Sequence, residues 1–257
     1  MELPPNPFKS ALLQGKQQLG LWCTINDTSI AEMLANCGFD WLMFDTEHSA
    51  LDPLTVLPLL QAVAPYPVHP IVRPTSLNPA EIKKLLDLGA QTLLVPYVQN
   101  AEEARLAADA VAYPPGGIRG VAGMTRASRY GAVPQYHQRA REQICLIVQV
   151  ETRSALDDLD NILAVPGVDA VFIGPSDLGA SLGYPGEPSH PAVKEACLDA
   201  VRRIRAAGKP AGFLTLDQEF LGEIIAAGSL FTAVDVDIAV LRRGALAQAE
   251  HWRQQTS

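Results

Sequence analysis

The chain has 257 residues, of which 48% are hydrophobic and 19% charged, and its formal net charge is −8. This composition is typical of a globular protein with a sizeable core, so we expect residues 1–257 to form one domain. The acidic balance, without clustered Lys and Arg, argues against a nucleic-acid partner, and no apolar run approaches the ~20 residues of a membrane span.

The N-terminal segment and the cysteines indicate a cytoplasmic protein. The opening residues, MELPPNPFKSALLQGK, contain no basic segment followed by an apolar one, so no signal peptide is predicted. Cys23, Cys37, Cys145 and Cys197 lie far apart and form no CxxC motif or Cys/His cluster. We therefore expect four buried, reduced thiols and a cytoplasmic location.

Short apolar segments alternate with amphipathic ones along the chain. The apolar segments read as strands covered on both faces, because they show no alternation with polar residues. Eight β-then-α units predict an α/β fold, a single-domain (β/α)8 TIM barrel, with an extra N-terminal helix around residues 8–14 that closes its bottom. The predicted strands are residues 19–25, 39–45, 69–74, 92–98, 144–151, 168–175, 210–215 and 230–237.

An open, doubly wound sheet is the alternative fold. No GxGxxG or GxxxxGK[ST] motif follows any predicted strand, so the nucleotide-binding fingerprints of that fold are missing. Two Gly-rich connections, residues 113–138 and 176–190, exceed a minimal βα loop. Long loops in a compact domain are usually functional or disordered, and the arginines of the first loop favour a function.

Polar side chains gather where the predicted strands end. In a (β/α)8 barrel the active site forms at these carboxyl ends, while the strand beginnings here carry far less charge. This asymmetry predicts a site at the barrel mouth. The residues in question are Asp45, Glu47, His48, Arg73, Gln149, Glu151, Ser176, Asp177, Asp235 and Asp237.

Glu151 and Asp177 end adjacent predicted strands, so both can reach one point at the mouth. Two carboxylates that converge repel each other unless a cation lies between them or one is protonated. All-oxygen ligation suits a hard divalent ion such as Mg²⁺ or Mn²⁺. The competing interpretation is that each acid caps the helix that follows it, and the sequence leaves both open.

Arg73, His48 and Asp45 add groups that could act on a substrate. Arg73 could pair with a neighbouring acid, or bind a carboxylate, a keto oxygen or a developing enolate. His48 resembles a general base whose ring is oriented by Asp45. Glu47 could hold the loop through backbone N–H groups or lie near the water ligands of a metal. No Lys follows a predicted strand, so a Schiff-base mechanism is not expected.

Several of these segments resemble one known family. They are GFDWLMFDTEHSALD, VRP, QTLLVPYVQNAEEA, YPPGGIRGVAG, RASRYG, VQVETRSAL, VDAVFIGPSDLGASLGYPG and HPAV. Together they resemble the HpcH/HpaI aldolases, over nearly the whole chain and in the expected order. Within that family the chain is most similar to 4-hydroxy-2-oxoheptanedioate aldolases and 2-keto-3-deoxy sugar-acid aldolases.

The resemblance implies a class II pyruvate aldolase that uses a divalent metal (Mg²⁺, Mn²⁺ or Co²⁺) and assembles as a homo-oligomer, usually a hexamer. It implies that Glu151 and Asp177 bind the metal and that Arg73 contacts the pyruvyl oxygens. Gln149 and Ser176, together with Asp177, would hold the pyruvate moiety. The expected partners are small molecules, pyruvate and an aldehyde.

The resemblance also implies that His48 and Asp45 form the acid–base pair. The sequence departs from the family pattern at two places, and both bear on the identity of the aldehyde partner. The loop RGVAGMTRASR is about one residue shorter than in the heptanedioate enzymes, and Asp235 stands where a small residue is expected. Two alternatives to the aldolase remain. One is a lyase acting on malyl or citramalyl thioesters, and the other is an inactive barrel used for binding.

Overall fold

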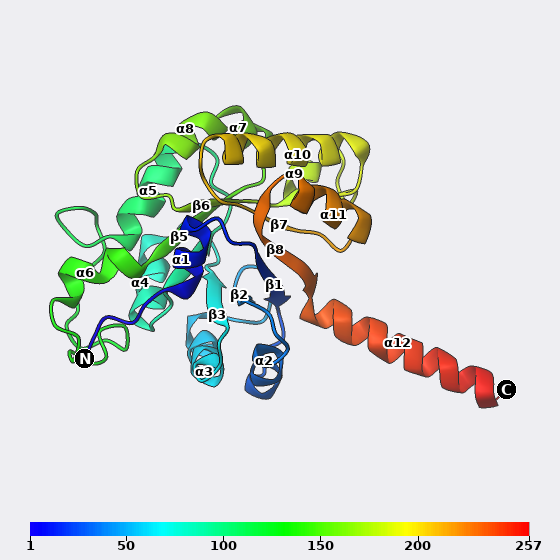
Figure 1. Ribbon diagram of the computed structural model, residues 1–257, viewed down its shortest axis with the longest axis horizontal. Helices are drawn as coiled ribbons and strands as arrows, with labels where there is room; N and C mark the ends of the chain where they lie inside the picture. The colour runs from blue at the N-terminus through cyan, green and yellow to red at the C-terminus, as the bar shows by residue number, and fades with distance from the viewer. Residues whose placement is uncertain (257) are drawn as a thin grey trace.

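The computed structural model describes residues 1–256 and confirms the barrel. Eight parallel strands close into one sheet, each paired with its neighbours in sequence order and the last with the first (Figure 1). All eight overlap the predicted segments. They are β1 (Gln18–Cys23), β2 (Trp41–Asp45), β3 (His69–Arg73), β4 (Thr92–Val95), β5 (Cys145–Val150), β6 (Ala170–Ile173), β7 (Ala211–Leu214) and β8 (Ser229–Val236).

Helices follow the strands and begin at short polar residues. Asp27, Asp52, Asn78 and Asn100 each accept backbone N–H groups with their side chains and so satisfy donors that a helix start leaves free. The helices are α1 (Pro7–Leu13), α2 (Thr28–Ala35), α3 (Pro53–Val63), α4 (Pro79–Asp87), α5 (Ala101–Val111), α6 (Tyr136–Gln143), α7 (Arg153–Asp157), α8 (Leu159–Ala164), α9 (Pro175–Ser181), α10 (Pro191–Ala206), α11 (Gln218–Ala226) and α12 (Asp237–Thr256).

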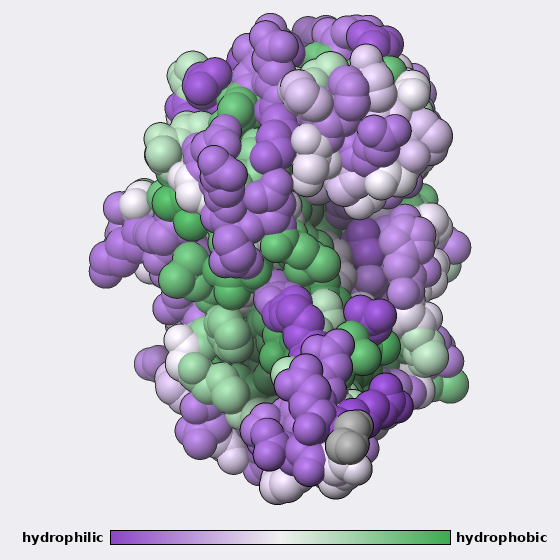
Figure 2. Space-filling model, turned by 90° about the vertical axis from the view of Figure 1, so that its right-hand side faces the viewer, coloured by the Kyte–Doolittle hydropathy of each residue, from purple (hydrophilic) through white to green (hydrophobic). Residues whose placement is uncertain are grey.

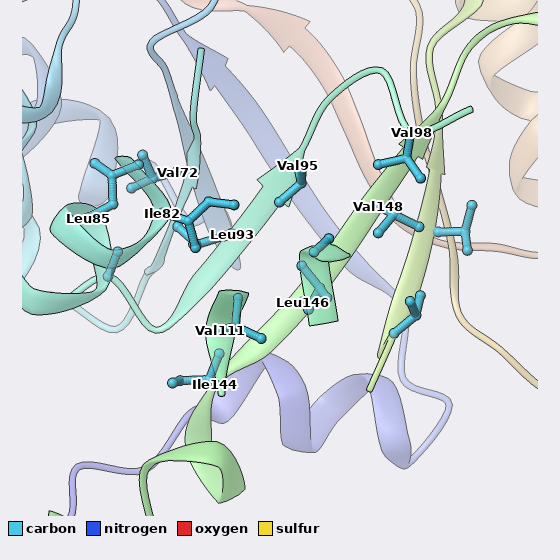
Figure 3. Close-up of a cluster of buried hydrophobic side chains, with 14 of the residues drawn as sticks. Val72, Ile82, Leu85, Leu93, Val95, Val98, Val111, Ile144, Leu146 and Val148 are labelled. Atoms are coloured by element: carbon cyan, nitrogen blue, oxygen red, sulfur yellow. The ribbon is translucent and has the colours of Figure 1, made fainter. Parts of the chain in front are cut away.

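The outer apolar layer lies between the barrel and its helices. In Figure 3, Val72 on β3 and Leu93 on β4 meet Ile82 and Leu85 of α4, and all four side chains are fully buried. Burying one such aliphatic side chain stabilises a fold by about 1.5–3 kcal/mol. The apolar runs in the sequence therefore supply both this layer and the barrel interior.

The two layers follow from the alternation of side chains along each strand. On β2, Leu42 and Phe44 belong to the outer layer, whereas Trp41 and Met43 belong to the interior cluster. Because side chains alternate with a period of two, the next inward position after Met43 is Asp45. The strand that packs the core thus delivers a carboxylate to the barrel mouth.

Helix α1 closes the bottom of the barrel, as predicted. Its Phe8 is buried and stacks on His69 with ring centroids 5.7 Å apart. The same ring meets Trp41 and Phe231 edge-on, at 6.2 and 5.7 Å. This aromatic plug separates the interior from solvent at the end opposite the strand carboxyl termini.

Helix α12 leaves the barrel and projects away from it (Figure 1). After Asp237 nearly all of its side chains are exposed, including the apolar Ile238, Leu241 and Trp252. On the face from which α12 projects, apolar side chains gather in a hollowed band (Figure 2). Within residues 1–256, no helix combines the length and the apolar character needed to cross a bilayer.

The long loop at residues 113–138 is held by arginines that contact α4. Arg119 is buried, its Nη2 donates to Asp87 at 2.7 Å, and its guanidinium lies 4.4 Å from the ring centre of Tyr113. Arg126 donates to the carbonyl of Leu88 at the end of α4. These two arginines thus have structural contacts.

The prediction of four buried thiols is wrong for one residue. Cys23, Cys145 and Cys197 are buried and unpaired, but Cys37 is exposed and also unpaired. Cys37 follows α2, beyond the last helical turn, where the chain runs across the surface before β2. There its Sγ contacts the carbonyl oxygen of Met33, one turn back on α2, at 3.4 Å.

Candidate active site

The inward positions at the strand ends bring most of the predicted residues to one cavity of about 410 Å³. Asp45 and Arg73 are direct register partners on β2 and β3. Gln149 continues the inward face of β5, after the interior residue Ile147. The predicted residues that line the cavity are Asp45, His48, Arg73, Gln149, Glu151, Ser176 and Asp177.

Asp235 and Asp237 do not line this cavity. Asp237 is buried and accepts the backbone N–H groups of Thr24 and Ile25 at 2.9 and 3.0 Å. Asp235 forms an ion pair with Arg243 on α12. Both acids therefore fix the junction between β8, α12 and the end of β1.

Asp45 and Arg73 form a buried, bidentate pair. Nε and Nη2 of Arg73 donate to the two oxygens of Asp45 at 2.9 and 2.7 Å, and Nε1 of Trp22 donates to the second oxygen at 3.0 Å. Burial by itself would raise the pKa of Asp45, but the hydrogen bond and charge of Arg73 outweigh it, and the pKa is lowered. Asp45 is thus an ionised carboxylate that fixes the guanidinium.

Glu47 lies on the other side of Arg73. Oε2 of Glu47 lies 2.8 Å from Nη1 of Arg73 and forms an ion pair with it. The geometry of this contact is not that of a hydrogen bond, so the buried Oε2 atom has no hydrogen-bond partner. The pKa of Glu47 is raised, mainly by burial. The charges of Arg73 and His48 act against this rise, whereas those of Asp45 and Asp177 add to it. The guanidinium therefore holds two carboxylates.

His48 has an exposed ring on the loop that follows β2, with 64% of its side chain accessible. The backbone N–H of His48 donates to Asp45 at 3.3 Å, but no side-chain hydrogen bond joins the ring to Asp45. The carboxylate nearest to the ring is Glu47, whose Oε2 lies 3.9 Å from Nε2. The structure thus brings His48 to the cavity without the expected contact between its imidazole and Asp45.

Glu151 is a buried carboxylate held in place by two donors. The backbone N–H of Tyr97 donates to Oε1 at 2.8 Å, and Nε2 of Gln149 donates to Oε2 at 2.5 Å. Burial raises the pKa of Glu151 to about 7, and the charges of Asp177 and Glu47 add to the rise against the two hydrogen bonds. Glu151 is therefore costly to ionise without a cation nearby.

Asp177 and Ser176 lie in the first turn of α9, directly after β6. Both side chains are exposed to the cavity, and neither makes a hydrogen bond within the described chain, so Asp177 does not cap α9 as the competing interpretation expected. Gly174 precedes them and has no room for a side chain. A Cβ atom there would lie 2.4 Å from Oε2 of Glu151.

The donor set fits a hard divalent cation. Among residues 1–256, no three His, Cys, Asp or Glu side chains converge closely enough to hold a metal by themselves. Glu151 and Asp177 nevertheless face one cavity, and the buried Oε1 of Gln149 has no partner. Two carboxylates, completed by water or substrate oxygens, match the ligand preference of Mg²⁺ or Mn²⁺.

Three residues that support the site were not predicted from the sequence. Trp22 lines the cavity, and its ring lies 4.7 Å from the Arg73 guanidinium. Tyr97 adopts a left-handed backbone, with φ 56°, where it donates to Glu151. Gly174 leaves space for Glu151. An apolar strand residue gives no sign of such contacts, but the glycine near the end of the predicted strand 168–175, directly before Pro175, was a usable signal of close approach.

Fold and cavity together define the class of the protein, a (β/α)8 barrel with carboxylates, a guanidinium and an imidazole around one small cavity. Comparison with known proteins makes the assignment specific. Residues 18–243 match the family model described as HpcH/HpaI aldolase/citrate lyase. The chain belongs to this family, as its sequence motifs predicted.

Individual relatives cover almost the whole chain. A pyruvate aldolase from Rhizobium etli is 57% identical, over 97% of this chain and 98% of its own. A 4-hydroxy-2-oxo-heptane-1,7-dioate aldolase from Klebsiella pneumoniae is 53% identical, over 95% of this chain and 92% of its own. A solved HpcH/HpaI family structure from Burkholderia cenocepacia superposes with a TM-score of 0.93 at 36% identity. The match covers 96% of this chain and 99% of that one. The protein is therefore an aldolase, a carbon–carbon lyase.

Proposed function

We propose that this aldolase is a class II pyruvate aldolase that depends on a divalent cation, Mg²⁺, Mn²⁺ or Co²⁺. It would cleave a 4-hydroxy-2-oxoacid reversibly to pyruvate and an aldehyde. The observation that carries the proposal is the pair of Glu151 and Asp177 on one cavity, with Arg73 fixed beside them. No lysine lines the cavity in residues 1–256, so the chain offers no Schiff-base alternative there.

Each polar residue of the cavity has a role in this proposal. Glu151 and Asp177 would hold the cation, which when bound supplies positive charge beside the C2 oxygen, where negative charge develops. Arg73, fixed by Asp45, would bind the same pyruvyl oxygens and stabilise the enolate, an effect typically worth a few kcal/mol. Gln149 and Ser176, with Asp177, would orient the pyruvate moiety.

Bond cleavage requires removal of the C4 hydroxyl proton. His48 is proposed to take this proton, since its exposed imidazole faces the cavity and histidine is the side chain that most often serves as a general base. The C3–C4 bond then breaks, the aldehyde forms, and the electron pair passes to the pyruvate enolate. Protonation at C3 completes the reaction. Asp45 is proposed to support His48 through the loop backbone, and Glu47 faces the ring itself.

The test is reversible removal of the metal. EDTA should abolish aldol cleavage, and added Mg²⁺, Mn²⁺ or Co²⁺ should restore it. As a control, Glu151→Ala and Asp177→Ala should lose metal affinity, measured by calorimetry, while the barrel stays folded. Full activity of the metal-free protein, or trapping of pyruvate on a lysine by borohydride, would contradict the proposal.

The same cavity could in principle serve a malyl or citramalyl thioester. A CoA partner calls for a basic patch to hold its phosphates. The cavity of the described chain is lined by one guanidinium, Arg73, which is already paired with Asp45 and Glu47. The aldolase is therefore the better supported function, and an inactive barrel is disfavoured because Glu151, Asp177, Arg73 and His48 all line the cavity.

We further propose that the protein is a homo-oligomer, with a hexamer as the expected form. The exposed apolar side chains of α12, Ile238, Leu241 and Trp252, support this proposal, because a lone helix gains little from projecting such residues into water. Sedimentation of the full chain tests it. A monomer at micromolar concentration would contradict it.

A further inference from the structure

A second cavity, of about 260 Å³, lies at the bottom of the barrel. Its lining includes His69, Gln91 and Ile144, which lie where β3, β4 and β5 begin, and part of the long loop at residues 113–138. It shares no lining residue with the cavity at the mouth. Active sites of TIM barrels form at the opposite end, so the aldol reaction does not account for this cavity.

The charge of the second cavity is opposite to that of the whole chain. The protein has a net charge of −8, yet no Asp or Glu of the described chain lines this cavity, whereas Arg126 and Arg129 do. Neither guanidinium forms an ion pair within residues 1–256. Burial lowers the pKa of Arg126, and the charge of Arg129 lowers it further. Two arginines without an acidic partner are the composition expected of an anion site.

Arg126 is held so that one edge of its guanidinium stays free. Its Nη1 donates to the carbonyl of Leu88 at 2.8 Å, and Gly89 leaves the space, since a Cβ atom there would lie 2.6 Å from Nη1. No hydrogen bond within the described chain uses Nε or Nη2 of Arg126. At the mouth, the same Nε–Nη2 edge of Arg73 binds both oxygens of Asp45. The free edge of Arg126 therefore matches a carboxylate.

The loop that carries both arginines is wound around a buried hydroxyl. Oγ of Ser128 lies 3.0 Å from the carbonyl oxygen of Thr125 and accepts the N–H of Gly131 at 3.1 Å. Arg129 and Tyr130 both have a left-handed backbone, with φ 53° and 55°. Residues other than glycine are strained in this conformation, which is found most often at active sites and ligand-binding sites. The position of Arg129 is thus fixed by the loop.

The N-terminal segment forms another part of the lining and is also held in place. Nε2 of Gln91 donates to the carbonyl of Pro4 at 2.8 Å. The apolar side chains of Leu3, Leu60 and Val68 add to the lining. The cavity therefore combines two guanidinium groups with apolar walls, which suits a small organic anion better than an inorganic one.

We propose that this cavity binds a small dicarboxylate, with one carboxylate at the free edge of Arg126 and the other at Arg129. Two carboxylates match two guanidinium groups in charge, and each can accept two parallel hydrogen bonds from one guanidinium. The apolar walls would contact the short carbon chain between them. This site is separate from the proposed aldol reaction and does not need the cation at the mouth.

Calorimetric titration of the full chain with succinate tests the proposal, in EDTA and at constant ionic strength. Without a divalent cation, the mouth offers a carboxylate only Arg73, which is already paired with Asp45 and Glu47. We expect one succinate per chain. Butyrate has the same four carbons and a single carboxylate. It should bind about ten- to hundredfold more weakly, the usual effect of losing hydrogen bonds to a charged group.

Arg129→Gln is the main variant. Its side chain is exposed, and Gln135 shows that glutamine adopts the same left-handed backbone in this chain, with φ 54°. Succinate should bind about ten- to hundredfold more weakly to this variant. Its affinity should approach that of butyrate, because one guanidinium remains. Arg126→Gln should weaken succinate binding to a similar extent.

The matched control is Arg139→Gln. Arg139 is an exposed residue of α6 that pairs with Glu142 and does not line the cavity. Its replacement should leave the affinity for succinate unchanged. Thermal melting without succinate checks that each variant is folded, and Arg129→Gln alone is sufficient for the test if Arg126→Gln does not fold.

Three calorimetric results would overturn the proposal: no binding of succinate, equal affinity for butyrate, or succinate binding that Arg129→Gln leaves unchanged. Loss of assembly in Arg129→Gln, followed by sedimentation without succinate, would also overturn it. That result would mean that the arginines receive a carboxylate from a neighbouring chain. Because succinate binding is measured without the metal, failure of the proposed aldol mechanism would not affect this inference.

Discussion

The two ends of the barrel both bury polar side chains but use them differently. At the bottom, Nδ2 of Asn6 donates to the hydroxyl of Thr92 at 3.0 Å, and Nε2 of His69 lies 2.7 Å from the same oxygen. Burial lowers the pKa of His69 to about 3, so the ring is neutral. This network is uncharged and its members satisfy one another.

At the mouth, the buried groups are charged and incompletely satisfied. Burial raises the pKa of Glu151 to about 7, and Oε1 of Gln149 is buried without a partner. Buried polar atoms in native proteins are nearly always hydrogen-bonded, and perturbed carboxyl groups cluster at functional sites. The comparison shows that the polar groups at the bottom satisfy one another, whereas those at the mouth leave Oε1 of Gln149 without a partner.

The largest effect should come from His48, the histidine at the mouth. His48→Ala should lower aldol cleavage by about 10²–10⁴-fold, the usual contribution of a positioned acid–base group. Its exposed ring should contribute under about 0.5 kcal/mol to stability. Steady-state kinetics measure the rate of cleavage, and thermal melting measures the stability. Near-normal turnover with a clearly lower melting temperature would make His48 a structural residue and weaken the comparison.

A somewhat smaller loss of rate should follow Arg73→Lys. One ammonium cannot replace the three nitrogens that contact Asp45 and Glu47, so the enolate would lose a fixed donor. We expect C3 proton exchange of pyruvate to fall by about 10²–10³-fold. Metal affinity, measured by calorimetry, is the control and should be retained. Normal exchange would remove Arg73 from the mechanism.

The bottom of the barrel should respond in stability and not in rate. His69→Ala removes a ring that stacks on Phe8 and leaves the Thr92 hydroxyl without one partner. We expect a loss of about 2–4 kcal/mol in the free energy of unfolding, from the cavity and the broken hydrogen bond. Urea unfolding and kcat/KM at low temperature measure it. A large loss of kcat/KM in a stable variant would show that the two ends are coupled.

The smallest expected effect concerns Glu151 in metal-free protein. Its folded pKa of about 7 lies above the ordinary value of 4.5, so ionisation is easier in the unfolded chain. Stability should therefore fall as pH rises from about 4.5 to about 7, and stay lowered above that range. Glu151→Gln should then be more stable at pH 8 by about 1–3 kcal/mol, with little difference near pH 4.5.

Urea unfolding in EDTA at the two pH values tests this expectation. The amide of Gln149 can turn so that its free Oε1 accepts from the new side chain. Thr152→Ser, at the neighbouring residue that caps α7 through its hydroxyl, serves as a control and should show no such dependence on pH. A gain in stability that is equal at both pH values would mean that ionising the buried carboxylate of Glu151 does not destabilise the fold.

Much of the fold followed from local patterns in the sequence. Apolar runs at regular spacing gave the eight strands, and the helix of Phe8 was expected at the bottom of the barrel. The strand-end position of Asp45, Arg73 and Glu151 predicted a mouth lined with charge, because the carboxyl ends of parallel strands meet at one end of a barrel. The family motifs in the sequence also indicated an aldolase.

The contacts within the site depended on the tertiary structure. Asp45 was expected beside His48, three residues away, but barrel closure sets it in register with Arg73, 28 residues away, which takes both of its oxygens. The sequence by itself determined that Asp45, Arg73 and Gln149 face inward at the strand ends, because a period of two fixes the inward face of each strand. Only the register and twist of the closed barrel decided which of them touch, because those distances depend on how neighbouring strands align.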